Sequence, residues 1–543
     1  LNSSKTEIVT SSSKYFPKYI TAESALAMMT LGLADPNVST IYPDNKLSSF
    51  FGRVSYDYKG KYLSSVTFRA DGSSKFAPQN QWGYFPSAAL AWRISNEHFM
   101  TNVNKWVSDL KLRASYGESG NNRISDNAWQ KSFSVGTGDL FMEGNETTPT
   151  TFLAPNSILS NPKLKWETTV TRNIGLDFGF FKNRLSGSVE VYKNTTHDLL
   201  LQATIPANTG YSKQWQNIGQ ISNKGLEIVL NGVIVEKKDF RLSASFNIGI
   251  NKNRIDKLGD TKSWQQSSNW ITSDGPTGDY LVQEGEPVGL MYGFVTDGMY
   301  SFDDFTYAKG KYTIKPGVPN DNALVGSSFF GPGALKLKDQ NGDGLVDDAH
   351  DKVVIGNANP KHTGGFNLTA QFKGFDFSAF FNWVYGNDIY NANKLLFTTF
   401  QGSRLYKNIL NIMNSDARFI NISKETGMVV TDPVLLADMN KNATMWSPEI
   451  GKAILHSWVI EDGSFLRLNN LTVGYSLPKN MLNTLHIDQL RIYATAYNLW
   501  IWTKYTGYDP EVDTQRATPL TPGVDWNAYP RSRSFNLGIN VTF

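Results

Sequence analysis

The chain has 543 residues, a formal net charge of +3 and no cysteine. The near-neutral charge predicts no nucleic-acid footprint, and the lack of cysteine excludes a disulfide scaffold, cysteine-ligated zinc and thiol catalysis. Mean hydropathy is −0.34, and no apolar run reaches the roughly 18 residues that a spanning helix needs. A membrane protein of this composition would therefore have to be a β-barrel, whose inward-facing polar residues dilute its hydropathy.

The first 45 residues are rich in Ser and Thr, and we expect an extracellular loop segment there, with a short helix possible around Ala25–Leu33. From Lys46 onward, apolar and polar residues alternate in run after run, which is the period of a half-buried β-strand. A helical link is expected through His98 and Val103. The expected strands, about 13 of them as barrel patterns go, are Leu47–Tyr58, Lys61–Asp71, Phe85–Ser95, Val107–Gly117, Lys165–Phe180, Arg184–Leu200, Ile221–Val235, Phe240–Ile250, His362–Phe372, Phe375–Tyr385, Ser464–Leu477, Leu490–Asn498 and Ser534–Phe543.

Short and long connections alternate between these strands. Lys59-Gly60 and Phe181–Asn183 are tight turns, whereas long polar segments are expected at 118–164, 251–361, 386–463 and 499–531. Loops of compact soluble domains have a median of about four to six residues. Transmembrane barrels combine short periplasmic turns with long extracellular loops. The organisation therefore favours an all-β fold, a transmembrane antiparallel barrel over residues 46–543.

The strand count has a further consequence. If the tight turns are periplasmic, the first and last expected strands both run inward, and such a set cannot close alone into an even-numbered barrel. We therefore predict that about nine preceding strands lie on another polypeptide, as nicking at an exposed loop would produce.

The last ten residues, SFNLGINVTF, alternate strictly and end on Phe543. This stretch resembles the closing strand of an outer-membrane barrel, in which the terminal aromatic residue is part of the insertion signal. A soluble β-domain ending in the same way is the alternative.

Longer strings resemble one family, the SusC/RagA-type TonB-dependent transporters of Bacteroidetes outer membranes. They run through nearly the whole chain in the family's order, and include FRADGSSKF (68–76), WGYFPSAALAWRISNEHF (82–99), LKLRASYGESGN (110–121), LSGSVEVYKNTTHDLLL (185–201), KGLEIVL (224–230), KDQNGDGLVDDAHDKVVIGNANP (338–360), SFLRLNNLTVGYSLP (464–478) and NLWIWTKYTGYDPEV (498–512). No signal peptide, TonB box or plug domain is found in these residues, so we interpret the chain as a C-terminal barrel portion.

The resemblance implies a barrel of about 22 strands, within the known size range. It implies active import of oligosaccharides or oligopeptides across the outer membrane. The implied partners are a SusD-like lipoprotein that lids the barrel, the N-terminal plug and barrel part on a separate chain, TonB–ExbB–ExbD, outer-membrane lipid, and in some cases a dimer of transporter–lipoprotein pairs.

One local motif predicts a metal. Asp339, Asn341 and Asp343 followed by Gly344 match the first half of an EF-hand calcium loop, with the Leu345 carbonyl as a further ligand. The position of the expected bidentate Glu holds His350, so Asp347 and Asp351, with Asp348 close by, would have to complete the shell. A structural Ca²⁺ that stiffens an extracellular loop is one interpretation. A turn that binds nothing is the other, because Asp, Asn and Gly favour turns.

Five tryptophans in the long segments are candidate ligand contacts, because aromatic faces stack on sugar rings and peptide side chains. They are Trp129, Trp215, Trp264, Trp270 and Trp446. Packing within folded loops, or a place in the interfacial girdle, is the alternative for each.

No catalytic constellation was found: the histidines form no HExxH pair, and no GxSxG elbow or Walker loop is present. We therefore predict no enzyme and no cofactor other than the calcium above. Two rival functions remain open. A passive porin-like channel would need neither plug nor lipoprotein, and a secreted glycan-binding β-protein would be extracted without detergent.

Overall fold

The computed structural model describes residues 2–6, 14–17, 32–35, 45–103, 105–126, 128–131, 133–136, 152–155, 158–259, 261–271, 275–326, 330–400, 407–482, 487–514 and 519–543. The chain divides into two compact units, and each is described by itself. Unit 1 comprises residues 1–93, 113–174 and 193–221, and unit 2 comprises 94–112, 175–192 and 222–543.

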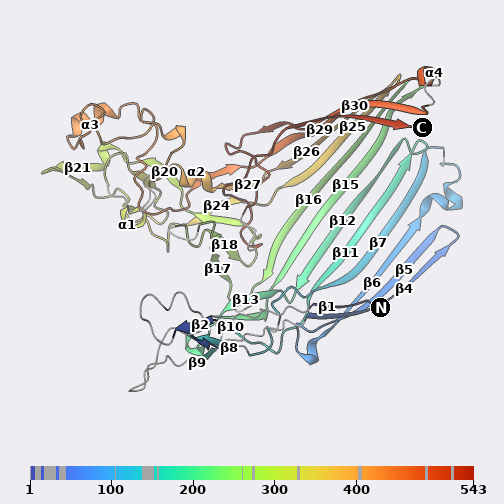
Figure 1. Cartoon of the computed structure of the whole chain (residues 1–543), viewed down its shortest axis with the longest axis horizontal. Helices are drawn as coiled ribbons and strands as arrows, with labels where there is room; N and C mark the ends of the chain where they lie inside the picture. Colours follow the sequence, from blue (N-terminus) through green and yellow to red (C-terminus); the bar gives the residue numbers. More distant parts are fainter. Residues whose placement is uncertain are drawn as a thin grey trace. The chain divides into compact units, whose positions relative to one another are not determined.

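The main element is a sheet of 14 strands, several of which are visible side by side in Figure 1. In hydrogen-bonded order they are β1 (Asn2–Thr6), β4 (Asn45–Tyr58), β5 (Tyr62–Ser73), β6 (Trp82–Arg93), β7 (Val107–Asn121), β11 (Glu167–Phe180), β12 (Leu185–His197), β15 (Gln220–Lys237), β16 (Phe240–Lys257), β25 (His362–Phe372), β26 (Phe375–Tyr385), β29 (Phe465–Ser476), β30 (Gln489–Thr503) and β32 (Ser534–Thr542). The pairs β4–β5, β5–β6, β16–β25, β25–β26, β26–β29, β29–β30 and β30–β32 are antiparallel.

Every strand of this sheet except β1 corresponds to a strand expected from the alternating pattern. The bounds of β25 and β26 agree with the expected ones, whereas β7, β16 and β30 extend several residues into segments expected to be loop. The helical link is present as the 3-10 turn His98–Met100. Local periodicity was therefore enough to locate the main sheet.

The N-terminal 45 residues are not loop throughout. Residues Asn2–Thr6 form β1, which pairs antiparallel with the start of β4, and Lys14–Pro17 (β2) pairs with Gly32–Asp35 (β3). The expectation of a plain loop was incomplete because these runs are too short to show a period. Most of the remaining segment, including nearly all of the apolar patch 25–33, lies outside the described residues.

The long segments also fold. In unit 1 β10 (Ile158–Leu159), β14 (Lys213–Asn217) and β13 (Leu200–Thr204) form one sheet, and β8 (Phe133–Gly136) pairs with β9 (Phe152–Pro155). In unit 2 one sheet has the order β17 (Ser263–Gln266), β18 (Tyr280–Gln283), β19 (Leu290–Gly293) and β24 (Val353–Asn357). Two further sheets are strand pairs, β20 (Thr296–Met299) with β23 (Leu335–Leu337) and β21 (Phe305–Ala308) with β22 (Lys311–Ile314). The last sheet has the order β28 (Ile460–Asp462), β27 (Asp388–Asn391) and β31 (Val524–Asp525).

Among the described residues there are also four short α-helices, α1 (Asn322–Val325), α2 (Ala392–Leu396), α3 (Pro433–Met439) and α4 (Lys479–Leu482), and several 3-10 turns. No helix in the described part of the chain is long and apolar enough to cross a membrane.

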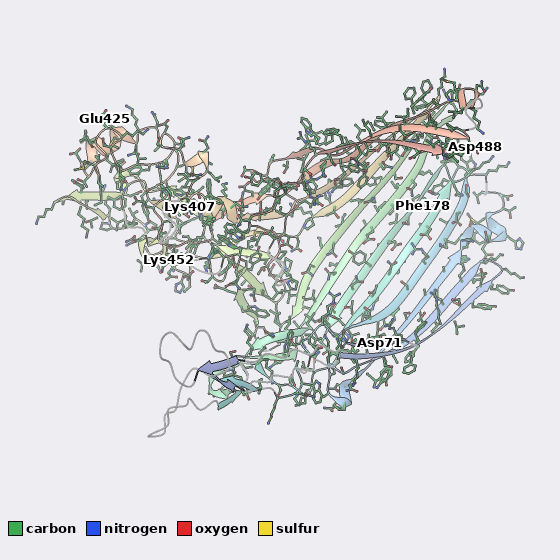
Figure 2. The ribbon with its side chains drawn as sticks, in the orientation of Figure 1. Asp71, Phe178, Lys407, Glu425, Lys452 and Asp488 are labelled. Carbon is green, nitrogen blue, oxygen red and sulfur yellow. The ribbon has the colours of Figure 1, made fainter. Side chains whose placement is uncertain are left out.

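We call the segments 258–361, 386–464 and 504–533 of unit 2 the loop body, since they connect strands of the main sheet and pack together. Figure 1 shows α1, α2, α3, β20 and β21 gathered there, and Figure 2 shows Lys407, Glu425 and Lys452 on it. Its largest apolar cluster takes Tyr280 from the first segment, Tyr390 from the second and Val524 from the third. Contacts among residues far apart in sequence therefore hold the three segments together.

Candidate functional site

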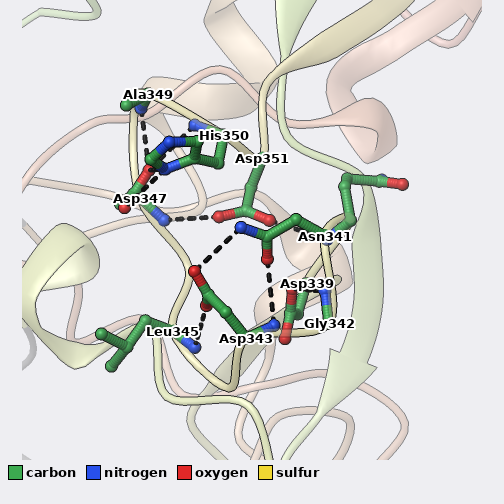
Figure 3. A network of polar contacts seen from close by, with 10 residues as sticks. Asp339, Asn341, Gly342, Asp343, Leu345, Asp347, Ala349, His350 and Asp351 are labelled. Atoms are coloured by element: carbon green, nitrogen blue, oxygen red, sulfur yellow. Dashed lines mark hydrogen bonds and ion pairs between the residues drawn. The ribbon is translucent and has the colours of Figure 1, made fainter.

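The predicted calcium loop lies in the loop body, between β23 and β24 (Figure 3). The two carboxylate oxygens of Asp339 accept the backbone N–H groups of Gly342 and Gly344, at 2.7 and 2.8 Å. The Gly344 N–H, the larger influence, holds the pKa of the Asp339 carboxyl below its usual range. Gly342 and Gly344 have positive φ, a conformation that glycine adopts without strain. The backbone of this turn therefore explains why glycine stands at these two positions of the Asp-x-Asn-Gly-Asp-Gly motif.

The other polar side chains of this loop also bond within it. The Asn341 amide donates to Asp343 Oδ2 at 2.8 Å, and Asp343 Oδ1 accepts the Leu345 N–H at 2.8 Å. Asp351, which is fully buried, accepts the N–H groups of Gln340 and Asp347 at 2.7 and 2.8 Å. The loop is therefore closed at both ends by carboxylates that bind backbone amides.

His350, which occupies the position of the expected bidentate ligand, is bonded to Asp347 through Nδ1 at 3.1 Å. This hydrogen bond raises the pKa of His350 and lowers that of Asp347. Among the described residues, no group of three or more His, Cys, Asp or Glu side chains is placed to hold a metal. The predicted ligands, which do not include His350, are all oxygen donors, and oxygen donors suit a hard cation such as Ca²⁺. Calcium binding stays a prediction.

The five candidate tryptophans fall in different surroundings. Trp270 and Trp446 are 3% and 5% exposed and belong to two buried clusters of the loop body. The Trp270 Nε1–H donates to the Tyr390 hydroxyl at 2.9 Å, which fixes the ring in the core. Packing in these clusters explains the positions of both rings, and their roles as ligand contacts stay predictions.

The remaining three are half-buried. In unit 1, the Trp129 Nε1–H donates to the Ser74 carbonyl at 3.3 Å, and Trp215 packs against an apolar cluster around Phe76 and Trp166. In unit 2, Trp264 pairs with Val282 in the β17–β18 ladder. Their roles as ligand contacts stay predictions, and local packing explains their positions.

A buried polar cluster that sequence reasoning missed lies in the loop body, within the segment 386–464 and at its contact with Thr296 of the first segment. Lys394 Nζ lies 3.1 Å from Glu461, donates to the Trp458 carbonyl at 3.0 Å, and stands 3.9 Å from the centre of the Trp458 ring. His456 is buried beside it and bonds Thr296 through Nδ1 at 2.8 Å. Burial, with a smaller effect from Lys394, lowers the pKa of His456 to about 3, so this ring is neutral. Thr296, Lys394 and the segment 456–461 are far apart in the sequence, and no sequence motif predicts that they are in contact.

The motif GYDPEV supplies a second buried pair. Arg467 at the start of β29 donates to Asp509 at 2.6 Å, and both side chains are buried. Arg531 adds a partly exposed bond to Glu511 at 2.9 Å. The motif therefore fastens the third segment of the loop body to a strand of the main sheet.

The main sheet exposes an apolar face. In unit 2, Phe535, Leu537 and Ile539 of β32 are 64–87% exposed, and the terminal Phe543 is 86% exposed. In unit 1, Val54, Tyr56, Val66 and Leu90 form the same kind of face on β4, β5 and β6. A soluble domain rarely leaves so much contiguous apolar surface in water.

Aromatic pairs lie along this face near the ends of the strands. Near short turns these include Tyr62–Trp92 in unit 1 and Phe375–Tyr475 in unit 2. Near long segments they include Phe50–Trp82 in unit 1 and Trp500–Trp502 in unit 2. An apolar band flanked by aromatic rows is the surface of a transmembrane barrel, with the rows at the two membrane interfaces. Fold and surface together define the class: the chain is an outer-membrane β-barrel wall.

The comparisons with known proteins specify the family. The family described as TonB dependent receptor-like, beta-barrel matches residues 19–499. TonB-dependent receptor P3 of Formosa agariphila is 32% identical over 538 residues, which are 97% of this chain and 48% of that protein. The TonB-dependent receptor SusC of Bacteroides thetaiotaomicron is 31% identical over 521 residues, covering 92% and 44%.

Solved structures agree. The RagAB peptide importer in its closed-closed state superposes with a TM-score of 0.69 at 26% identity, over 94% of this chain and 49% of that one. This chain belongs to the TonB-dependent receptor β-barrel family, in its SusC/RagA branch, and its location is the outer membrane. It spans about half the length of the curated relatives it matches.

Proposed function

We propose that this chain forms the C-terminal barrel portion of a TonB-dependent importer. The observation that carries the proposal is the match over 97% of the chain to a relative named as a TonB-dependent receptor, on a sheet whose outward face is apolar and aromatic. The matched relatives are named as receptors and importers rather than enzymes, which supports a transport role.

The proposed cargo is an oligosaccharide or an oligopeptide. The structural relative is titled a peptide importer, which supports the oligopeptide class. The loop body supports a capture role, because its buried clusters give it a fixed surface on which a ligand or a partner could bind without first ordering a loop.

The proposed partners follow from the same family. They are a SusD-like surface lipoprotein over the loop body, the N-terminal plug and barrel part on a separate chain, TonB–ExbB–ExbD, and a second transporter–lipoprotein pair in a dimer. Ligand captured under the lipoprotein would enter the lumen when force on the plug opens a path. The part of the relatives' length that this chain does not span leaves room for a plug and further strands.

We further propose that the loop 339–351 takes Ca²⁺. Asp339, Asn341, Asp343 and the Leu345 carbonyl would supply one side, and Asp347 and Asp351 the other. The bound ion would stiffen the link between β23 and β24 and has no part in transport chemistry.

The first test is mass spectrometry of everything that co-purifies with this chain from membranes in mild detergent. A polypeptide carrying a plug and about nine strands, together with a lipoprotein, is the expected result. A chain that is monomeric and soluble without detergent would overturn the barrel assignment.

A second test separates an importer from a passive channel. Uptake of a labelled oligopeptide library by cells is expected to stop when TonB is deleted or the proton-motive force is collapsed. Uptake that continues at the same rate would identify a passive channel.

A further inference from the structure

Two lysines of unit 2 lie next to each other where β15 begins and β16 ends. The two strands are neighbours in the main sheet (Figure 1). Asn223 Oδ1 accepts the side-chain amides of Asn251 and Asn253, at 3.0 and 3.1 Å. Lys224 follows Asn223, and Lys252 stands between the two asparagines. Because successive side chains of a strand point to opposite faces, Lys224 and Lys252 are cross-strand neighbours on the other face of the sheet.

That other face is the apolar face of the main sheet. Lys252 lies an even number of residues after Phe240 in the same strand, so both side chains point to one face. Cross-strand pairs connect Phe240 to the exposed Ile539 of β32, through Phe372, Phe375, Tyr475 and Ile492. The two lysines therefore share the face that contacts lipid.

An aromatic row lies just inside the two lysines. The His362 ring stacks on Tyr385 at 4.9 Å, and the Trp383 Nε1–H donates to His362 Nδ1 at 3.0 Å. Extending the β16–β25 register by one residue puts Ile250 opposite His362, and Lys252 is the next residue outward on that face. Aromatic rows mark the membrane interface, so the lysines lie at the depth of the lipid headgroups, at the end of the sheet that leads into the loop body.

The two ammonium groups need a counter-charge. Both lysines are exposed, and neither side chain has a hydrogen bond or ion pair with another described residue. The closest carboxylate farther along this face of β16, Asp256, already accepts the Ser222 hydroxyl at 3.0 Å and lies 4.0 Å from Arg254. Like charges opposite each other on neighbouring strands are destabilising. An anion held between the lysines would remove this repulsion and accept charge-assisted hydrogen bonds from both.

We propose that Lys224 and Lys252 bind the phosphate of a phosphorylated lipid in the outer leaflet. The phosphate supplies the complementary charge, and the acyl chains of the same molecule continue inward past Ile250 and the aromatic row. A free anion would use only the lysines, whereas a lipid uses both the charge and the apolar surface beneath it. The inference needs the outer-membrane location of the sheet but not the proposed import or its cargo.

The test is native mass spectrometry of the full-length transporter, purified with its partner chains in mild detergent without phosphate. The probes are monophosphoryl lipid A, the same lipid after removal of its phosphate, and inorganic phosphate. Lys224→Gln combined with Lys252→Gln removes the two facing charges. The matched control is Lys237→Gln combined with Lys238→Gln, which removes the same charge from exposed residues at the short-turn end of the same strand pair.

The wild-type protein is expected to bind the first phosphorylated lipid about tenfold more tightly than the dephosphorylated one, because each basic residue near an anionic headgroup adds to the affinity. The Lys224→Gln and Lys252→Gln variant should lose this preference. The control should keep it, and so should Lys224→Arg combined with Lys252→Arg, which retains both charges.

A second measurement uses thermal unfolding. Lys224→Glu places a carboxylate beside Lys252, so the sheet supplies its own counter-charge. The phosphorylated lipid should raise the Tm of the wild-type protein, as any ligand of the folded state does, and should have little effect on the Tm of Lys224→Glu.

Four outcomes would overturn the proposal. They are equal affinity for the two lipids, a preference that survives the paired Gln substitutions, an equal loss in the control, and binding of inorganic phosphate alone with the same dependence on the lysines. The third would show a general effect of net charge, and the fourth would assign the lysines to a free anion. Resistance of each variant to SDS unfolding shows that the barrel has formed. Uptake is not measured, so failure of the proposed import would be seen separately.

Discussion

The strands of the main sheet in unit 2, which we call the wall, expose their large apolar side chains, whereas the loop body of unit 2 buries its own. On β32 the large apolar side chains point outward, and Leu537 is 87% exposed. In the loop body Leu337, Tyr390 and Val459 are fully buried. The two regions belong to one chain but are built for different solvents, since lipid replaces water around the wall.

The largest effect is expected at the ion pair that joins the wall to the loop body, Arg467 of β29 with Asp509. Replacing Arg467 with Met removes the nearer cation from buried Asp509 and leaves only the Arg531 Nε contact at 3.6 Å; breaking a buried pair costs about 3–5 kcal/mol. We expect the segment 504–533 to lose hydrogen-exchange protection while the strands of the wall keep theirs. Arg531→Met removes the partly exposed pair with Glu511 and the longer 3.6 Å contact with Asp509; it is the comparison variant and should cost less, about 1 kcal/mol. Equal effects of the two variants would contradict a role for Arg467 as the fastening point.

Within the loop body, Leu337→Ala should behave as a substitution in a soluble core. It creates a cavity beside Phe294 and Val346, and a cost of about 3 kcal/mol is expected. Limited proteolysis and hydrogen exchange of residues 290–346 would show it. The matched control is Leu537→Ala on the wall, whose effect should be smaller and should not reach the loop body.

On the wall, a charge tests which solvent the apolar face meets. Ile539→Arg lies midway along β32, opposite Ile492 of β30. Arginine at the bilayer midplane costs about 2–4 kcal/mol, so unfolding in urea from lipid vesicles should shift by that amount. Asn540→Arg, on the other face of the strand, is the control. If both variants were equally stable, this face would not contact lipid.

Buried acids give the loop body a pH dependence. Burial raises the pKa of Asp321 to about 7, and its Oδ2 accepts the Leu337 N–H at 3.0 Å. A raised carboxyl pKa means that the folded body binds a proton more tightly than the unfolded chain, so its stability falls as pH rises from about 4 through 7. Asp321→Asn removes that charge, and we expect it to stabilise the body by about 2 kcal/mol at pH 8 and by little at pH 4. Hydrogen exchange at the two pH values measures this, and an equal gain at both would be inconsistent with titration of Asp321.

Calcium should have the smallest effect. At a concentration about ten times the dissociation constant, Ca²⁺ would stabilise the loop by about 1.4 kcal/mol. Protection of residues 339–351 from exchange should rise with Ca²⁺ and fall with EGTA, and Asp343→Ala should abolish the response while Asp348→Ala should weaken it less. An unchanged exchange pattern in Ca²⁺ would leave the loop as a turn held by its own hydrogen bonds.

The candidate sites were only partly visible in the sequence. The turn 339–351 was found because its glycines and carboxylates are local and their spacing is set by the backbone. The sequence did not show that Trp270 and Trp446 are buried, because an aromatic residue in a polar segment has the same appearance whether it packs or binds. The buried pairs Lys394–Glu461 and Arg467–Asp509 had no signal, since each joins residues more than 40 positions apart.

The sequence by itself determined the strands of the main sheet. A strand between lipid and lumen must alternate apolar and polar residues, and this alternation can be recognised in each short stretch of sequence. The sequence also determined where the chain turns tightly, as at Lys59-Gly60. Only the tertiary structure decided that the long segments form one packed body, that Asn2–Thr6 adds a strand beside β4, and that Lys224 and Lys252 are neighbours on β15 and β16. These features depend on which distant residues meet, and no local period records that.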